Sequence, residues 1–107
     1  MSDRIMFLRD KFGSPVGCLA IVINSKTRLV EYQFSVVNAS QDTFDRETAR
    51  VLAIGRLASA PIAIPLREKN LNMFDITRAV MKNFSRREGT PSRAVKAAKL
   101  WLKQNVA

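Results

Sequence analysis

Histidine is absent from the sequence, and cysteine occurs once in its 107 residues. Without histidine the chain lacks the Ser-His and Cys-His pairs of ordinary nucleophilic sites. A single cysteine allows neither an internal disulfide nor a cysteine-based metal site. The glycine-rich phosphate-binding patterns GxxxxGK[ST] and GxGxxG are missing too. We therefore expect a protein that is not an enzyme and that uses no metal or cofactor.

Long apolar runs are also missing. No hydrophobic stretch reaches the roughly 18–20 residues that cross a bilayer, and charged residues between Asp3 and Asp10 interrupt any N-terminal secretory signal. The length and the 47% hydrophobic content are ordinary for one globular domain. We expect a single compact domain over residues 1–107, located in the cytoplasm.

Acidic residues are scarce, with 9 Asp and Glu against 18 Lys and Arg, which gives a net charge of +9. The excess lies near the C-terminus. Residues 76–107 hold eight basic residues and one acidic residue, Glu88, for a net charge of +7. Such a charge balance bears on partners rather than on fold, and it favours a polyanion.

The first third of the chain has the pattern of three strands. Residues 4–9 form a mixed apolar run, residues 16–23 are apolar on both faces, and residues 30–36 alternate apolar and polar side chains. Turn-forming residues separate the three runs. We predict an antiparallel meander, with Cys18 as a buried thiol in its second strand.

Helical spacing follows. We predict a helix from an N-cap at Asp42 to about Ser59, and a short edge strand over 62–66, where prolines limit hydrogen bonding. The residues that recur at helical spacing in this first helix predict its core face, with Arg46 and Arg50 on another face. The core-face residues are Thr48, Val51, Leu52, Gly55 and Ala58.

Two further helices are predicted. One covers Asn72 to Phe84 and is followed by a basic turn over 85–89. The other begins at Thr90 as N-cap, with Pro91 in the first helical position, and runs to about Asn105. The fold class is therefore α+β: a three-stranded antiparallel meander plus one short edge strand, packed with three helices in the order βββαβαα.

The last helix is predicted to have two opposite faces. Alanines and Trp101 form the apolar face, and the basic residues lie on the other, where only Leu100 interrupts them. A ladder of cations about one turn apart can follow a phosphate backbone, with counterion release and steep salt dependence. The predicted nucleic-acid-binding residues are Arg78, Lys82, Arg86, Arg87, Arg93, Lys96, Lys99 and Lys103.

Two other interpretations apply to this basic helix. It is an ordinary solvated surface, or it lies on anionic lipid; the mostly alanine apolar face inserts poorly, so we expect no membrane partner. Single-strand binding would call for exposed aromatic rings. Phe12, in the first turn, is the best candidate, whereas Tyr32, Phe34, Phe74 and Phe84 are predicted in the core. The sequence leaves strandedness open.

One resemblance concerns the carboxylates. Three antiparallel strands, then a helix that opens near Glu47, then another strand, are similar to the first half of the ribonuclease H fold, with Asp10 at the end of the first strand. That resemblance implies several carboxylates around two divalent metals, but Leu66-Arg67 stands where a further acid is expected. We assign Asp10 and Glu47 to structural capping and carry over no activity.

A second resemblance covers more of the chain. It rests on Gly13 to Ala20, Tyr32 to Asn38, Asp42 to Asp45, Ala53 to Leu57 and Lys96 to Leu102. Over these segments the sequence resembles a group of small, mostly uncharacterised proteins of tailed bacteriophages. The resemblance implies a phage origin and expression in a bacterial host cytoplasm, and it brings no catalytic residues.

Two classes of function remain. In the first, the cationic C-terminal third binds nucleic acid, with DNA favoured over RNA. In the second, the protein is a phage-encoded interaction module or inhibitor that binds an acidic host protein. Nucleic-acid binding predicts a continuous basic stripe with exposed aromatic or amide side chains, whereas an inhibitor predicts a compact patch with apolar residues at its centre. Self-association is compatible with both.

Overall fold

The computed structural model describes residues 3–24, 26–36, 46–65 and 72–105. These residues form one antiparallel four-stranded sheet and three helices, in the predicted order βββαβαα. The strands are β1 (Asp3–Arg9), β2 (Pro15–Asn24), β3 (Leu29–Val36) and β4 (Ile62–Pro65), and the helices are α1 (Arg46–Ser59), α2 (Met73–Arg86) and α3 (Ser92–Gln104). The predicted α+β fold class is confirmed.

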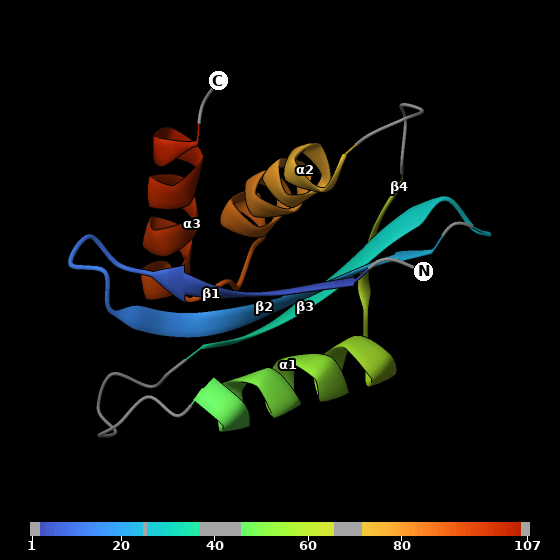
Figure 1. Cartoon of the computed structure of the whole chain (residues 1–107), viewed down its shortest axis with the longest axis horizontal. Coiled ribbons are helices and arrows are strands. Elements are labelled where there is room, and N and C mark those ends of the chain that lie inside the picture. The colour runs from blue at the N-terminus through green and yellow to red at the C-terminus, as the bar shows by residue number, and fades with distance from the viewer. Residues whose placement is uncertain (1–2, 25, 37–45, 66–71, 106–107) are drawn as a thin grey trace.

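Each strand pairs with its neighbour in the sequence, so the sheet order is β1-β2-β3-β4. The short β4, which begins after Pro61 and ends at Pro65, lies at one edge, as its prolines predict. Strands β2 and β3 occupy the centre. Helix α1 covers one face of the sheet, and α2 and α3 cover the other (Figure 1).

The two faces of β2 enter different clusters. Leu19 and Ile21 pack with α2 and α3 in the larger core, and Cys18 and Ala20 pack against α1. This division explains why β2 is apolar on both faces. It also confirms Cys18 as a buried thiol: burial raises its pKa, an effect that the positive charge of Arg50 partly offsets.

Helix α1 faces the opposite way from the sequence prediction. Ala49 and Ala53 are its buried residues, whereas Val51 is 57% exposed and Leu52 and Ile54 also lie in solvent. The side chains that β2 places below the helix, Cys18 and Ala20, are small, so small helix residues allow the closest packing there. The predicted core face of this helix is therefore wrong, and Asp42, its predicted N-cap, lies outside the described residues.

Two hydrogen bonds hold α1 in this orientation. The buried Ser35 hydroxyl on β3 donates to the Ala49 carbonyl at 2.7 Å, and Arg56 Nη1 donates to the Phe34 carbonyl at 2.8 Å. Both bonds join the helix to β3 and need Ala49 to face the sheet. The outward position of Val51, two residues further along the helix, follows from the same geometry.

Helix α2 ends two residues later than predicted. Its N-cap is Asn72, whose side-chain oxygen accepts from the Asp75 amide at 2.8 Å, and the helix ends at Arg86, so Ser85 and Arg86 are helical rather than part of the turn. Thr90 is not the N-cap of α3. Its hydroxyl donates to the Phe84 carbonyl at 3.3 Å, and Pro91 occupies the N-cap position.

The aromatic residues divide into core and surface. Tyr32 and Phe84 are buried, and Phe34 stacks edge-on against Phe84 with ring centroids 4.7 Å apart. Phe74 was predicted in the core but is partly exposed, and its ring packs against Trp101 at 6.0 Å near the end of α3. Within the described residues, none of the helices is long and apolar enough to cross a membrane.

Candidate nucleic-acid interface

Helices α2 and α3 lie side by side over the sheet because each has one apolar face. Helix α2 buries Ile76, Val80 and Phe84, and α3 contributes its three alanines. The small alanine side chains let α3 approach the sheet and α2 closely. This packing leaves the polar faces of both helices toward solvent, and the two helices carry seven of the 18 basic residues of the chain.

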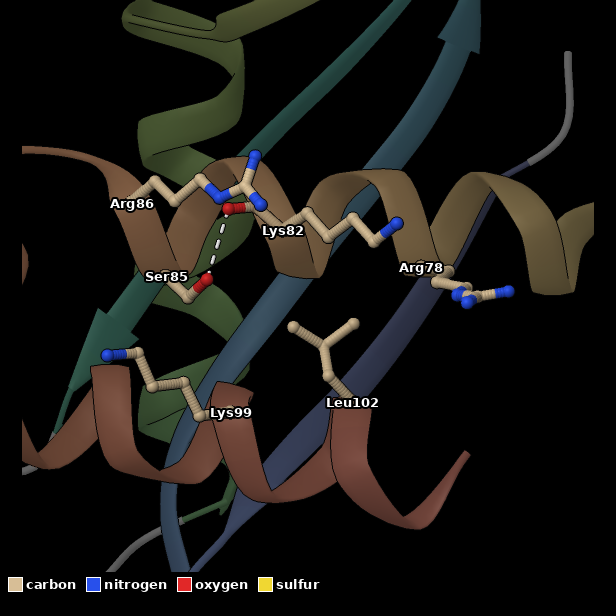
Figure 2. A pocket seen from close by; sticks show the side chains of 6 residues that line it. All are labelled: Arg78, Lys82, Ser85, Arg86, Lys99 and Leu102. Atoms are coloured by element: carbon tan, nitrogen blue, oxygen red, sulfur yellow. Dashed lines mark hydrogen bonds between the residues drawn. The ribbon is translucent and has the colours of Figure 1, made fainter. Parts of the chain in front are cut away.

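A groove of about 580 Å³ runs between the two helices on this outer side. We call it the α2–α3 groove; it is lined by Arg78, Lys82, Ser85, Arg86, Lys99 and Leu102. In Figure 2, Lys99 and Leu102 extend from α3 toward the helix that carries the other four residues. Four of the predicted binding residues, Arg78, Lys82, Arg86 and Lys99, therefore line the same groove.

The spacing along α2 explains this convergence. Arg78, Lys82 and Arg86 are four residues apart, so they follow one side of the helix at intervals of about 6 Å. The Ser85 hydroxyl donates to the Lys82 carbonyl at 3.0 Å and lies among them. Lys99 adds a fourth cation from the facing helix.

None of the lining residues of the α2–α3 groove is acidic. Among residues 3–24, 26–36, 46–65 and 72–105 there is one ion pair, between Arg50 and Glu47. It lies on α1, on the other side of the sheet. The four groove cations have no carboxylate partner in that part of the chain. Their charges therefore repel one another, and an anion placed between them would relieve this repulsion.

A second groove, of about 340 Å³, lies between the turn that joins β1 to β2 and the N-terminal half of α3. We call it the turn–α3 groove; it is lined by Asp10, Lys11, Phe12, Val16, Arg93, Lys96, Ala97 and Leu100. Leu100, which interrupts the basic face in the sequence, contributes to this lining. Lys96 here and Lys99 in the α2–α3 groove are three residues apart on α3, so the helix separates two adjoining basic grooves.

The remaining two predicted residues line neither groove. Lys103 is exposed on the last turn of α3. Arg87 follows α2 as its C-cap, and its amide donates to the Phe84 carbonyl. Its positive charge acts on Tyr32 of β3, where it partly offsets the rise in pKa caused by burial.

The two carboxylates of the ribonuclease H resemblance have structural partners. Asp10 Oδ1 accepts the backbone amides of Phe12 and Ser14, and Glu47 pairs with Arg50 on α1. In the described part of the chain, His, Cys, Asp and Glu side chains nowhere form a group of three that could hold a metal ion. The capping role predicted for Asp10 agrees with its hydrogen bonds.

Sequence reasoning missed that Lys11 and Phe12 lie beside α3. Phe12 was predicted as an exposed aromatic, but nothing in the local pattern says which helix the first turn approaches. The one available signal was Leu100, an apolar residue on a basic face, which indicates a neighbour at that position.

Comparison of the chain with known protein families, curated proteins and solved structures finds no match.

Proposed function

We propose that the protein binds nucleic acid through the α2–α3 groove. The observation that carries this proposal is the convergence of Arg78, Lys82, Arg86 and Lys99, from two helices, in a groove without an acidic residue. A concave surface lined by charge of one sign focuses the electrostatic field and attracts ions of the opposite sign. Nucleic acid is the common intracellular polymer with regularly spaced negative charges, and we expect DNA to be preferred over RNA.

The lining of the groove favours a polymer with repeating charge over a folded acidic protein. Protein interfaces concentrate their binding energy in large apolar or aromatic residues at the centre of the contact. The α2–α3 groove offers Leu102 as its one large apolar side chain, with cations on both sides. An acidic host protein is the second candidate, and the resemblance to bacteriophage proteins is the reason to include it in the test.

Fluorescence polarisation with labelled DNA and RNA, single-stranded and double-stranded, would test the proposal across a range of salt concentrations. Four phosphate contacts predict a slope of log affinity against log salt of about −3.6 for duplex DNA and about −2.8 for a single strand. We expect Lys99→Gln to reduce the duplex slope by about 0.9, because one counterion fewer is released. The Lys82→Gln/Lys99→Gln double variant should reduce it by about twice as much.

Lys26→Gln is the matched control. Lys26 is also exposed but lies in the turn between β2 and β3, outside the lining of the α2–α3 groove. Its replacement should leave the slope unchanged, and circular dichroism would confirm that all variants are folded. The proposal is wrong if no polymer binds at low salt, or if Lys26→Gln and Lys99→Gln have equal effects. Binding to an acidic polypeptide but to no nucleic acid would favour the second candidate.

A further inference from the structure

The turn between β1 and β2 presents an aromatic ring to solvent. Phe12 is 81% exposed, the highest value among the large hydrophobic residues described. A single exposed apolar side chain is common on protein surfaces. Phe12 differs because hydrogen bonds hold its backbone in place and because it borders a groove lined by apolar and basic side chains.

Hydrogen bonds fix the backbone on both sides of Phe12. Asp10 Oδ1 accepts from the amides of Phe12 and Ser14 at 2.9 and 3.0 Å, and the Asp10 carbonyl accepts from the Gly13 amide at 3.0 Å. Gly13 has a φ of 81°, which favours glycine, and Arg9 Nη1 donates to its carbonyl at 2.8 Å. The ring is therefore carried by an ordered turn, and a ligand that stacks on it avoids the entropic cost of ordering that turn.

The turn–α3 groove combines an apolar lining with positive charge. Val16, Ala97 and Leu100 supply the apolar side, next to the ring of Phe12. Arg93 and Lys96 extend from α3, and Lys11 Nζ lies 5.1 Å from the centroid of the Phe12 ring. Asp10 is the one acid in the lining, and its carboxylate is already engaged by the two turn amides. A flat apolar group with a negative charge beside it matches this lining.

We propose that the turn–α3 groove binds an unstacked base of single-stranded nucleic acid. The base stacks on Phe12, and Arg93 and Lys96 contact the phosphates on either side of it. A base within a duplex has both faces covered by its neighbours, so the groove selects single strands. This inference rests on the proposed function, because the same strand would continue over α3 from Lys96 to Lys99 and enter the α2–α3 groove.

The test compares a labelled oligothymidine with a blunt duplex of equal length, using wild-type protein, Phe12→Ala and Phe12→Trp. Base stacking contributes about 1–3 kcal/mol per base, so Phe12→Ala should weaken single-strand binding by about 5- to 150-fold. Duplex affinity should change by less than about twofold, and the salt slope should stay the same because no phosphate contact is removed. Phe12→Trp should retain single-strand affinity.

The outcomes separate this inference from the proposed function. Salt-dependent binding of wild-type protein, with single-strand affinity unchanged by Phe12→Ala, would overturn the role of Phe12 and leave the α2–α3 groove standing. No binding to either polymer would remove both. If Phe12→Ala weakened the binding of oligothymidine and of duplex equally, the assignment of a base to this groove would also be overturned. The same holds if a poly-glutamate peptide bound more tightly than oligothymidine and its binding depended on Phe12. A thermal melt checks folding, and we expect little change because the side chain is exposed.

Discussion

Raising the pH tests the core directly, because the chain has a single tyrosine and that tyrosine is buried. Tyr32 lies on β3, its hydroxyl donates to Asn83 Oδ1 at 2.5 Å, and its ring meets the edge of Phe84. Burial raises the pKa of Tyr32 from 10.0 to about 12, and the positive charge of Arg87 opposes part of that rise. We therefore expect the folded protein to keep this proton about two pH units beyond the ordinary value.

The same shift sets the contribution of Tyr32 to stability. In the unfolded chain the phenol loses its proton near pH 10, whereas the folded chain holds it until about pH 12. The folded state therefore binds more protons between these values, and its stability falls as the pH rises through them. A shift of two units corresponds to about 2–3 kcal/mol, fully present below pH 10 and lost progressively toward pH 12.

Ultraviolet absorbance of tyrosinate measures this titration without interference from another tyrosine. We expect a midpoint well above 10, coincident with loss of structure by circular dichroism if unfolding comes first. Arg87→Gln should move the midpoint upward, because it removes the charge that stabilises tyrosinate. Arg86→Gln, the adjacent arginine that lines the α2–α3 groove, is the control and should have little effect. A midpoint near 10 in protein that is still folded would refute the buried position of Tyr32.

Two stability measurements by urea denaturation check the packing on either side of the sheet. Val51→Thr should change the free energy of unfolding by less than about 0.5 kcal/mol, because Val51 faces solvent. Ala53→Val should lower it by about 1–3 kcal/mol, because Ala53 lies in a closely packed site. The reverse result would mean that α1 faces the other way. Gly17→Ala should also cost about 1–3 kcal/mol, because its Cβ would clash with the Ser35 carbonyl of the paired strand. Gly55→Ala is its control. No atom from the rest of the fold lies within 4 Å of the added methyl group, so this variant should gain about 0.5–1 kcal/mol in the free energy of unfolding. A similar loss of stability in both variants would contradict the described contacts.

The sheet was predictable from the sequence because each strand carries its own signal. Period-two alternation marks β3, a two-sided apolar run marks β2, and the prolines around β4 place it at an edge. The orientation of α1 was not predictable in this way. The helix has a large-residue face around Val51 and a small-residue face around Ala53, and the small side chains of the sheet decide between them.

The candidate site was predictable in part. Spacing along α2 places Arg78, Lys82 and Arg86 on one side of that helix, but only the packing of α2 against α3 brings Lys99 to them. Spacing also groups Arg93 with Lys99 on one basic face, whereas the structure assigns them to different grooves. The separation follows from the neighbours of α3, which are α2 on one side and the first turn on the other, and helical periodicity carries no information on either.

The turn–α3 groove joins a segment around Phe12 to one around Arg93, which are distant in the sequence. Closing so long a loop is entropically costly, and the cost is recovered only when α3 packs on β1 and β2. We therefore expect the groove to form late in folding. Any local unfolding that detaches α3 from the sheet should abolish it, because its lining residues would then no longer be adjacent. A strand bound across both grooves would oppose that unfolding, so the melting temperature of the protein should rise with the concentration of its ligand.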